Sequence, residues 1–196
     1  MRQQVVHLFA LVGESMVGAT HALLSGDREL AKSVVQRDIE IDKIVTALLT
    51  VAEGALTSDE APPAAEREEL LRLTKILPEI ERNGDLAEHI ARRAARGLGA
   101  EMSPRSRGLV ERCGEVAVTI WRAATDAIVD GDESAVIAIE EIDDELDDLH
   151  VSLTAELVSG SMALPVAVEV AMIARFYERF GDHCVNMARR QISRAD

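Results

Sequence analysis

Hydrophobic residues recur along most of the chain at the three- and four-residue spacing that marks one face of an α-helix. In the first such segment, residues 3–24, the apolar positions include Val5, Leu8, Val12 and Met16. The segment is followed by Ser25-Gly26-Asp27, where glycine ends one helix and aspartate can cap the next. A second helix is therefore predicted over residues 28–56.

Clusters of proline, glycine and serine separate the remaining helical segments. Residues 57–65 contain Pro62 and Pro63 and predict a loop. Further helices are predicted over residues 66–97 and 105–129, and two more are separated by Ser159-Gly160-Ser161, the last running almost to the C-terminus. Six long helices in a chain dominated by helix-forming residues predict an all-α protein.

One stretch occurs twice in the chain. Residues 81–93 and 178–190 both read Glu-Arg-x-Gly-Asp, then five residues, then Ala-Arg-Arg. The preceding helices also correspond, because Gly26, Asp38 and Asp42 match Gly131, Asp143 and Asp147 at an offset of 105 residues. The repeated stretches themselves are only 97 residues apart, because the loop with the prolines lengthens the first half. We therefore predict two tandem three-helix bundles, residues 1–100 and 101–196, forming an internal repeat with pseudo-twofold symmetry.

Each half carries two pairs of acidic residues at i and i+4, a spacing that places both side chains on one helix face. Like charges at this spacing destabilise a helix by about 0.2–0.5 kcal/mol per pair. If the second and third helices of a half are antiparallel neighbours, four carboxylates crowd one surface, and a bound cation relieves their repulsion. The candidate metal ligands are Asp38, Asp42, Glu81, Asp85, Asp143, Asp147, Glu178 and Asp182.

A single acidic pair of this kind is usually solvated surface, so the prediction depends on the recurrence of both pairs in both halves. A glycine also precedes the second acid of the repeated stretch in each half, Gly84 and Gly181. Glycine inside a helix costs about 1 kcal/mol relative to alanine. Its recurrence indicates close approach of another backbone or of an ion. His183 is expected at the edge of the packed surface, and Trp121 in the core or at a dimer contact.

Composition and charge exclude several classes of protein. The net charge of −14 disfavours binding to nucleic acid or to an anionic membrane. The two cysteines, Cys113 and Cys184, form no CxxC pair, and neither a signal peptide nor a membrane span is recognised, so a soluble cytoplasmic protein is expected. Without a Gly-rich phosphate loop, a nucleophile motif or a Glu-x-x-His pair, the sequence favours neither an enzyme nor a ferritin-like oxidase.

The two motifs together resemble those of the PhoU family of phosphate-uptake regulators. Residues 37–42 read Arg-Asp-Ile-Glu-Ile-Asp, similar to the family's motif on the second helix. Residues 175–188 resemble the family's Arg-Tyr-x-Glu-Arg-Ile-Gly-Asp-His-x-x-Asn-Ile-Ala signature almost throughout. In the first half Leu86 stands where the second half has His183. The resemblance covers essentially the whole chain.

The resemblance implies a cytoplasmic, two-repeat helical bundle that forms a homodimer. It implies that the eight carboxylates bind divalent or trivalent metal ions, with iron, zinc, magnesium and manganese as candidates. It also implies a regulator that restrains the high-affinity phosphate importer and its sensor kinase when phosphate is plentiful, by contacting the importer's ATPase subunit and the sensor histidine kinase. Given the net charge, its docking faces are expected to be acidic. Two alternatives stay open: a metal-storage or metal-buffering bundle, and an accessory subunit of another ion transporter.

Overall fold

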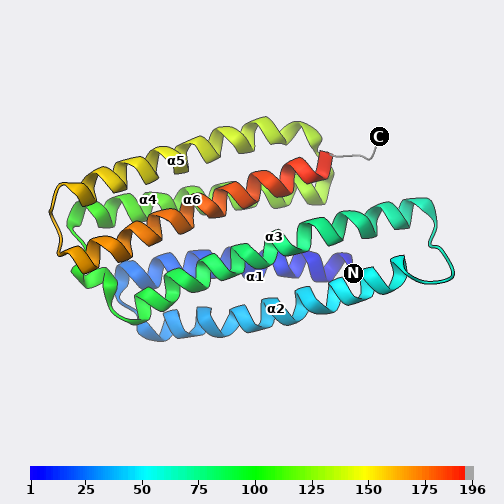
Figure 1. The fold of residues 1–196 in the computed structure, drawn as a ribbon, viewed down its shortest axis with the longest axis horizontal. Coiled ribbons are helices and arrows are strands. Elements are labelled where there is room, and N and C mark those ends of the chain that lie inside the picture. The colour runs from blue at the N-terminus through cyan, green and yellow to red at the C-terminus, as the bar shows by residue number, and fades with distance from the viewer. Residues whose placement is uncertain (193–196) are drawn as a thin grey trace.

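Six long α-helices account for most of the structure, a computed structural model that describes residues 1–192 (Figure 1). Two short 3-10 helices, η1 (Leu98–Glu101) and η2 (Glu133–Ala135), lie between them, and no strand occurs in residues 1–192. The predicted all-α class is confirmed. The long helices are α1 (Arg2–Ser25), α2 (Arg28–Leu56), α3 (Ala64–Ala95), α4 (Pro104–Asp130), α5 (Val136–Val158) and α6 (Leu164–Ile192).

The helix ends follow the sequence signals closely. Gly26 and Gly131 end α1 and α4 with φ of 76° and 71°, a left-handed conformation that glycine adopts at little cost. Asp27 caps α2 by accepting a hydrogen bond from the Leu30 amide at 2.9 Å. The equivalent Asp132 instead accepts from the Ser134 amide and begins η2, an element that the helical pattern did not predict.

The two repeats pack side by side, and the end of the α2–α3 hairpin extends beyond the second repeat (Figure 1). In Figure 1, α3 and α6 lie side by side in front, α1 and α4 lie behind them, and α2 and α5 form the two outer edges. Buried apolar residues from all six helices form one continuous core cluster. Trp121 belongs to it: the side chain is 2% exposed, and its indole N–H donates to the Phe9 carbonyl oxygen at 2.9 Å, which joins α4 to α1. The expectation that Trp121 lies in the core is confirmed.

Helix α1 is the most apolar of the six. It is the one helix in residues 1–192 that is long and apolar enough to cross a membrane, although this criterion also admits core helices of soluble proteins. Half of the apolar window is buried inside the bundle, where Leu8, Val12 and Met16 are fully covered. Its inner face is therefore ordinary core.

Candidate metal centre

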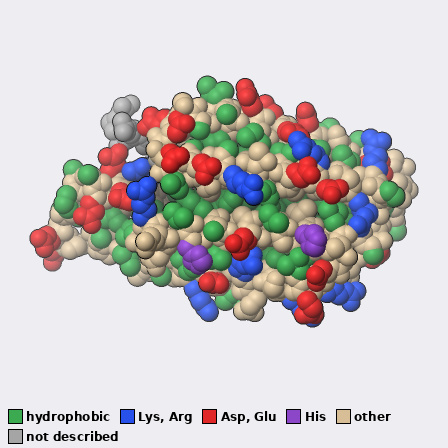
Figure 2. All heavy atoms as spheres, turned by 180° about the vertical axis from the view of Figure 1, so that it is seen from behind, with side chains coloured by type: hydrophobic (Ala, Val, Ile, Leu, Met, Phe, Trp, Pro, Cys, Tyr) green, Lys and Arg blue, Asp and Glu red, His purple; other side chains and the backbone are tan. Residues whose placement is uncertain are grey.

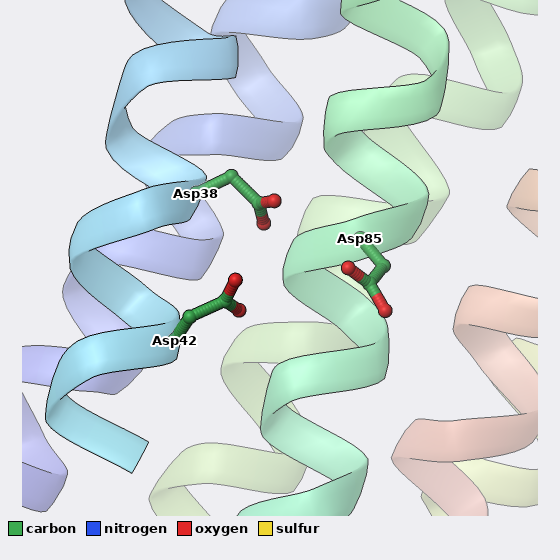
Figure 3. A group of neighbouring side chains, drawn as sticks. All are labelled: Asp38, Asp42 and Asp85. Carbon is green, nitrogen blue, oxygen red and sulfur yellow. The ribbon is translucent and has the colours of Figure 1, made fainter. Parts of the chain in front are cut away.

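The first repeat brings three of its predicted ligands into one tight group. Asp38 and Asp42 lie on successive turns of α2, and Asp85 faces them from α3 (Figure 3). One carboxylate oxygen from each lies within 4.8 Å of the others. Glu81, one turn before Asp85, borders the group: partial burial, followed by the charges of Asp42 and Asp85, raises the pKa of its carboxyl. The predicted convergence of α2 and α3 therefore occurs.

Asp38 carries the strongest electrostatic signal of this group. Burial raises its pKa to about 7, and the negative charges of Asp42, Asp85 and Glu88 add to the effect. Its Oδ1 atom is buried and accepts no hydrogen bond. A buried carboxylate oxygen without a donor is costly to ionise. A cation at this point would supply the missing partner, so the residues present fit a metal ion with oxygen ligands.

The second repeat reproduces the arrangement with a looser geometry. Burial, then the charges of Asp147, Asp182 and Glu178, raises the pKa of Asp143 to about 7. Its Oδ1 is also buried without a hydrogen-bond partner. An acidic pocket of about 350 Å³ lies beside Asp143 and Asp182.

The two clusters differ in how tightly their oxygens gather. Across residues 1–192, only the first repeat holds three acid oxygens within 4.8 Å of one another. In the second repeat, Glu178 accepts a hydrogen bond from Arg175 on its own helix. The first repeat has Pro78 at that position, so its Glu81 has no such arginine. The second cluster is therefore anchored partly by an internal ion pair.

The repeated glycines make room for these buried aspartates. A Cβ atom built on Gly84 would lie 3.2 Å from Asp38 Oδ1, and one on Gly181 would lie 2.1 Å from Asp143 Oδ1. Both glycines lie within α-helices, so space rather than backbone conformation requires them. The expected close approach is real, but the neighbour is a carboxylate of the adjacent helix rather than another backbone. Each glycine thus positions a candidate ligand.

A separate buried polar cluster, which we call the α3–α6 seam, joins the two repeats at Glu79. This carboxylate is 1% exposed, and its oxygens contact His183 Nδ1 at 2.6 Å, Arg82 Nη1 at 2.8 Å and Arg190 Nη2 at 2.9 Å. The sequence interpretation placed His183 at an edge, whereas the structure places it between the two repeats.

The sequence interpretation missed Glu79, yet a signal for it was present. Glu79, Asn83, Leu86 and Ile90 follow the helical spacing of the buried face of α3, and all four are buried. A charged residue and an amide on such a stripe indicate a buried polar contact. The sequence interpretation also missed Glu88, which lies beside the first cluster, is 6% exposed and pairs with Arg92. The second repeat has Val185 at the equivalent position.

Fold and site together define a duplicated helical bundle in which each three-helix repeat presents one partly buried carboxylate cluster. Comparison with known proteins then identifies the family. The model of the PhoU domain matches residues 5–94 and 110–191, so both repeats are recognised. The chain belongs to the PhoU family.

Relatives and solved structures agree with this assignment. The "phosphate-specific transport system accessory protein PhoU homolog 2" of Mycobacterium tuberculosis is 32% identical over 200 residues, covering 100% of this chain and 92% of that protein. Homolog 1 of Mycobacterium leprae is also 32% identical, over 100% and 89% of the two chains. The crystal structure of PhoU from Pseudomonas aeruginosa superposes with a TM-score of 0.89 at 26% identity, covering 97% and 93% of the two chains.

Proposed function

We propose that this protein is a regulator of phosphate uptake and phosphate signalling that binds metal ions at one carboxylate cluster per repeat. The names of its relatives support the first part, since they are accessory proteins of phosphate-specific transport systems. Metal binding is supported by the buried Oδ1 atoms of Asp38 and Asp143, which have no hydrogen-bond partner. Gly84 and Gly181 leave the space that these two oxygens occupy. The regulator acts by binding in the cytoplasm rather than by catalysis.

The metal would be held by residues from two helices in each repeat. In the first, Asp38, Asp42 and Asp85 would form the inner group, with Glu81 beside them; the second would use Asp143, Asp147, Glu178 and Asp182. A bound cation supplies positive charge that neutralises these carboxylates. All-oxygen ligands suit magnesium, manganese and iron, and carboxylates can also bind zinc.

The proposed partners are the ATPase subunit of the high-affinity phosphate importer and a sensor histidine kinase. The protein restrains both when phosphate is plentiful, and it works as a homodimer. A strain lacking the gene should express a phosphate-starvation reporter even in phosphate-rich medium, and the wild-type gene should restore repression. Normal repression and normal phosphate uptake in the deletion strain would contradict the proposed regulatory role.

Metal analysis tests the carboxylate clusters independently. Protein purified without chelator should carry a small fixed number of ions per chain, and Glu178→Ala with Asp182→Ala should lower that number without unfolding the bundle. The matched control is Glu141→Ala with Asp148→Ala, because these acids are exposed on α5 and their removal changes the net charge equally. Unchanged metal content in the first double variant refutes the second-repeat ligands, and many ions per chain would favour the storage alternative.

A further inference from the structure

The end of the bundle that holds the α5–α6 turn carries the most exposed large apolar side chains in residues 1–192 (Figure 1). Val158, at the end of α5, is 82% exposed, and Leu164, at the start of α6, is 76% exposed. Val151, Val168 and Met172 continue this surface along the two helices and are 67%, 55% and 42% exposed. Leu164, Val168 and Met172 follow one another at intervals of four residues, so they share one face of α6. We call these five residues the hairpin patch.

The matching hairpin of the first repeat shows that the fold does not require an apolar surface at these places. Residues 151–174 contain two charged residues, whereas the matching residues 46–77 contain nine. Exposed apolar residues that the fold does not require indicate contact with a partner. At the offsets of 105 and 97 residues that relate the repeats, the counterparts of the hairpin patch are mostly polar: Thr46, Glu53, Arg67, Leu71 and Lys75.

The two acids of the second hairpin are both neutralised by arginines of neighbouring helices. Glu156 pairs with Arg105 at 3.5 Å and accepts a hydrogen bond from Ser103 at 3.0 Å. Glu169 pairs with Arg93 at 2.7 Å. The α5–α6 turn can therefore leave water without burying an unpaired charge, which would be costly.

Arginines surround the hairpin patch at the same end of the molecule. Residues 92–107, which cover the end of α3, η1 and the start of α4, hold five arginines and one acid, Glu101. The side chain of Arg105 is 74% exposed, and Arg96 is exposed beside the first turn of α6. Arg28 is exposed next to η1. We call Arg28, Arg96 and Arg105 the basic collar.

Charge is unevenly distributed between the two ends of the molecule. Residues 53–69, at the tip of the α2–α3 hairpin, hold six acids and one base, and this tip lies at the opposite end from the α5–α6 turn (Figure 1). Figure 2 shows acidic side chains on that projecting tip and several basic ones at the other end.

The distance between the ends separates their electrostatic effects. Helix α2 has 29 residues and spans about 43 Å, which is several times the screening length of about 8 Å at physiological salt. The net charge of −14 therefore does not describe the surroundings of the hairpin patch. The expectation that the molecule avoids an anionic membrane, drawn from that net charge, does not extend to this end.

We propose that the hairpin patch and the basic collar form a peripheral membrane contact, in which the α5–α6 turn enters the headgroup region of an anionic bilayer. The apolar side chains leave water there, while the arginines meet lipid phosphates. A protein partner is the alternative, but it does not require an uncharged turn together with a ring of cations, whereas an anionic lipid surface requires both. The inference goes beyond the proposed regulation and needs neither that role nor the metal clusters.

Flotation with lipid vesicles tests the contact directly. The probes are vesicles of phosphatidylcholine with about 30% phosphatidylglycerol, which supply a negative surface, and vesicles of phosphatidylcholine alone. Chelator in the buffer prevents divalent ions from bridging acids of the protein to lipid phosphates. The wild type should float with the anionic vesicles at about 50 mM salt, and its partition coefficient should fall by about 10-fold or more at about 500 mM salt.

The apolar part is tested by Val158→Glu with Leu164→Arg. This double variant keeps the net charge, and each new residue is the one that the first repeat has at the equivalent place. It should lower the partition coefficient by about 10-fold or more, because two apolar side chains no longer leave water. The matched control is Val51→Glu with Leu71→Arg on the opposite hairpin, where the two side chains are 56% and 43% exposed. It should float as the wild type does.

The basic collar is tested by Arg28→Gln with Arg105→Gln, which should also lower the partition coefficient by about 10-fold or more. The matched control, Lys43→Gln with Lys75→Gln, removes the same charge from exposed positions on α2 and α3 outside the collar and should leave flotation unchanged.

Circular dichroism should show native helix content in all four variants, and Val158→Ser with Leu164→Ser replaces the charged pair if that variant does not fold. A wild type that does not float with anionic vesicles overturns the proposal and assigns the hairpin patch to a protein partner. Equal flotation of the wild type with neutral vesicles, or wild-type flotation of the patch or collar variant, also overturns it. The deletion strain and the metal analysis test the proposed function separately, so either proposal can fail without the other.

Discussion

Replacement of the two repeated glycines by alanine should affect the two repeats unequally. Alanine favours a helix by about 1 kcal/mol over glycine, and both positions lie inside helices. At Gly84 the new Cβ would lie 3.2 Å from Asp38 Oδ1 and 3.3 Å from an Ile41 methyl carbon, contacts that small shifts can relieve. The gain and the strain should nearly cancel, so Gly84→Ala should change the free energy of unfolding by less than about 1 kcal/mol.

At Gly181 the same change creates an overlap that small shifts cannot relieve. The new Cβ would lie 2.1 Å from Asp143 Oδ1 and 2.8 Å from Leu146 Cδ1, so the Asp143 carboxylate must leave its position and Leu146 must move. We expect Gly181→Ala to lower the free energy of unfolding by about 1–2 kcal/mol after the gain in helix propensity is included. That loss lowers the melting temperature by about 2–8 °C for a chain of this size.

Thermal unfolding of both variants in chelator, followed by manganese titration in a calorimeter, checks this reasoning. Gly181→Ala should weaken manganese binding to the second cluster more than Gly84→Ala weakens binding to the first, because only the former must expel a candidate ligand. Gly54→Ala is a control for helix propensity, since nothing lies within 4 Å of a Cβ at that position. Equal stabilisation by alanine at all three positions would refute the claim that these glycines are spacers for aspartates.

Two further predictions concern the buried acids. The pKa values of Asp38 and Asp143, raised from 3.8 to about 7, mean that the folded state binds protons more tightly than the unfolded state, so the metal-free protein should lose stability as pH rises from about 4 to about 7. Manganese affinity should rise over the upper part of this range, because the carboxyl groups must lose their protons to bind the ion. Calorimetry at several pH values tests both trends on the wild type and on the double variant Asp38→Asn with Asp143→Asn. If stability and manganese affinity depend on pH in the variant as they do in the wild type, Asp38 and Asp143 are not the titrating groups. Glu79→Ala should lower the free energy of unfolding by about 1–3 kcal/mol, because three partners lose one buried acceptor, whereas the exposed Glu68→Ala should have little effect in the same urea titration.

The helices and their order were predictable because local signals agree with the fold. Apolar spacing, Gly26 and Gly131 at helix ends, and Asp27 as a cap each depend on a few neighbouring residues. Helical spacing likewise predicted which pairs of carboxylates share one helix face. The prediction was wrong at η2, where Asp132 accepts a hydrogen bond from the Ser134 amide and begins a tight turn instead of capping an α-helix directly.

Contacts between helices were harder to predict, because they depend on rotation and register that helical spacing leaves free. The sequence could therefore not reveal that Gly181 faces Asp143, or that His183 meets Glu79 across the repeats. Nor could it separate the tight first cluster from the looser second one, since both have the same spacing in the sequence. That difference depends on which arginines reach which acids in three dimensions, as Arg175 reaches Glu178.

The continuous core has a consequence for how this duplicated chain can be divided. Helices α3 and α6 share the buried Glu79 contacts, and α1 and α4 share the Trp121 hydrogen bond. A fragment ending after η1 would expose the apolar sides of α1 and α3 to water and leave Glu79 without two of its three partners. Half of this molecule, expressed alone, should therefore aggregate or pair with another half.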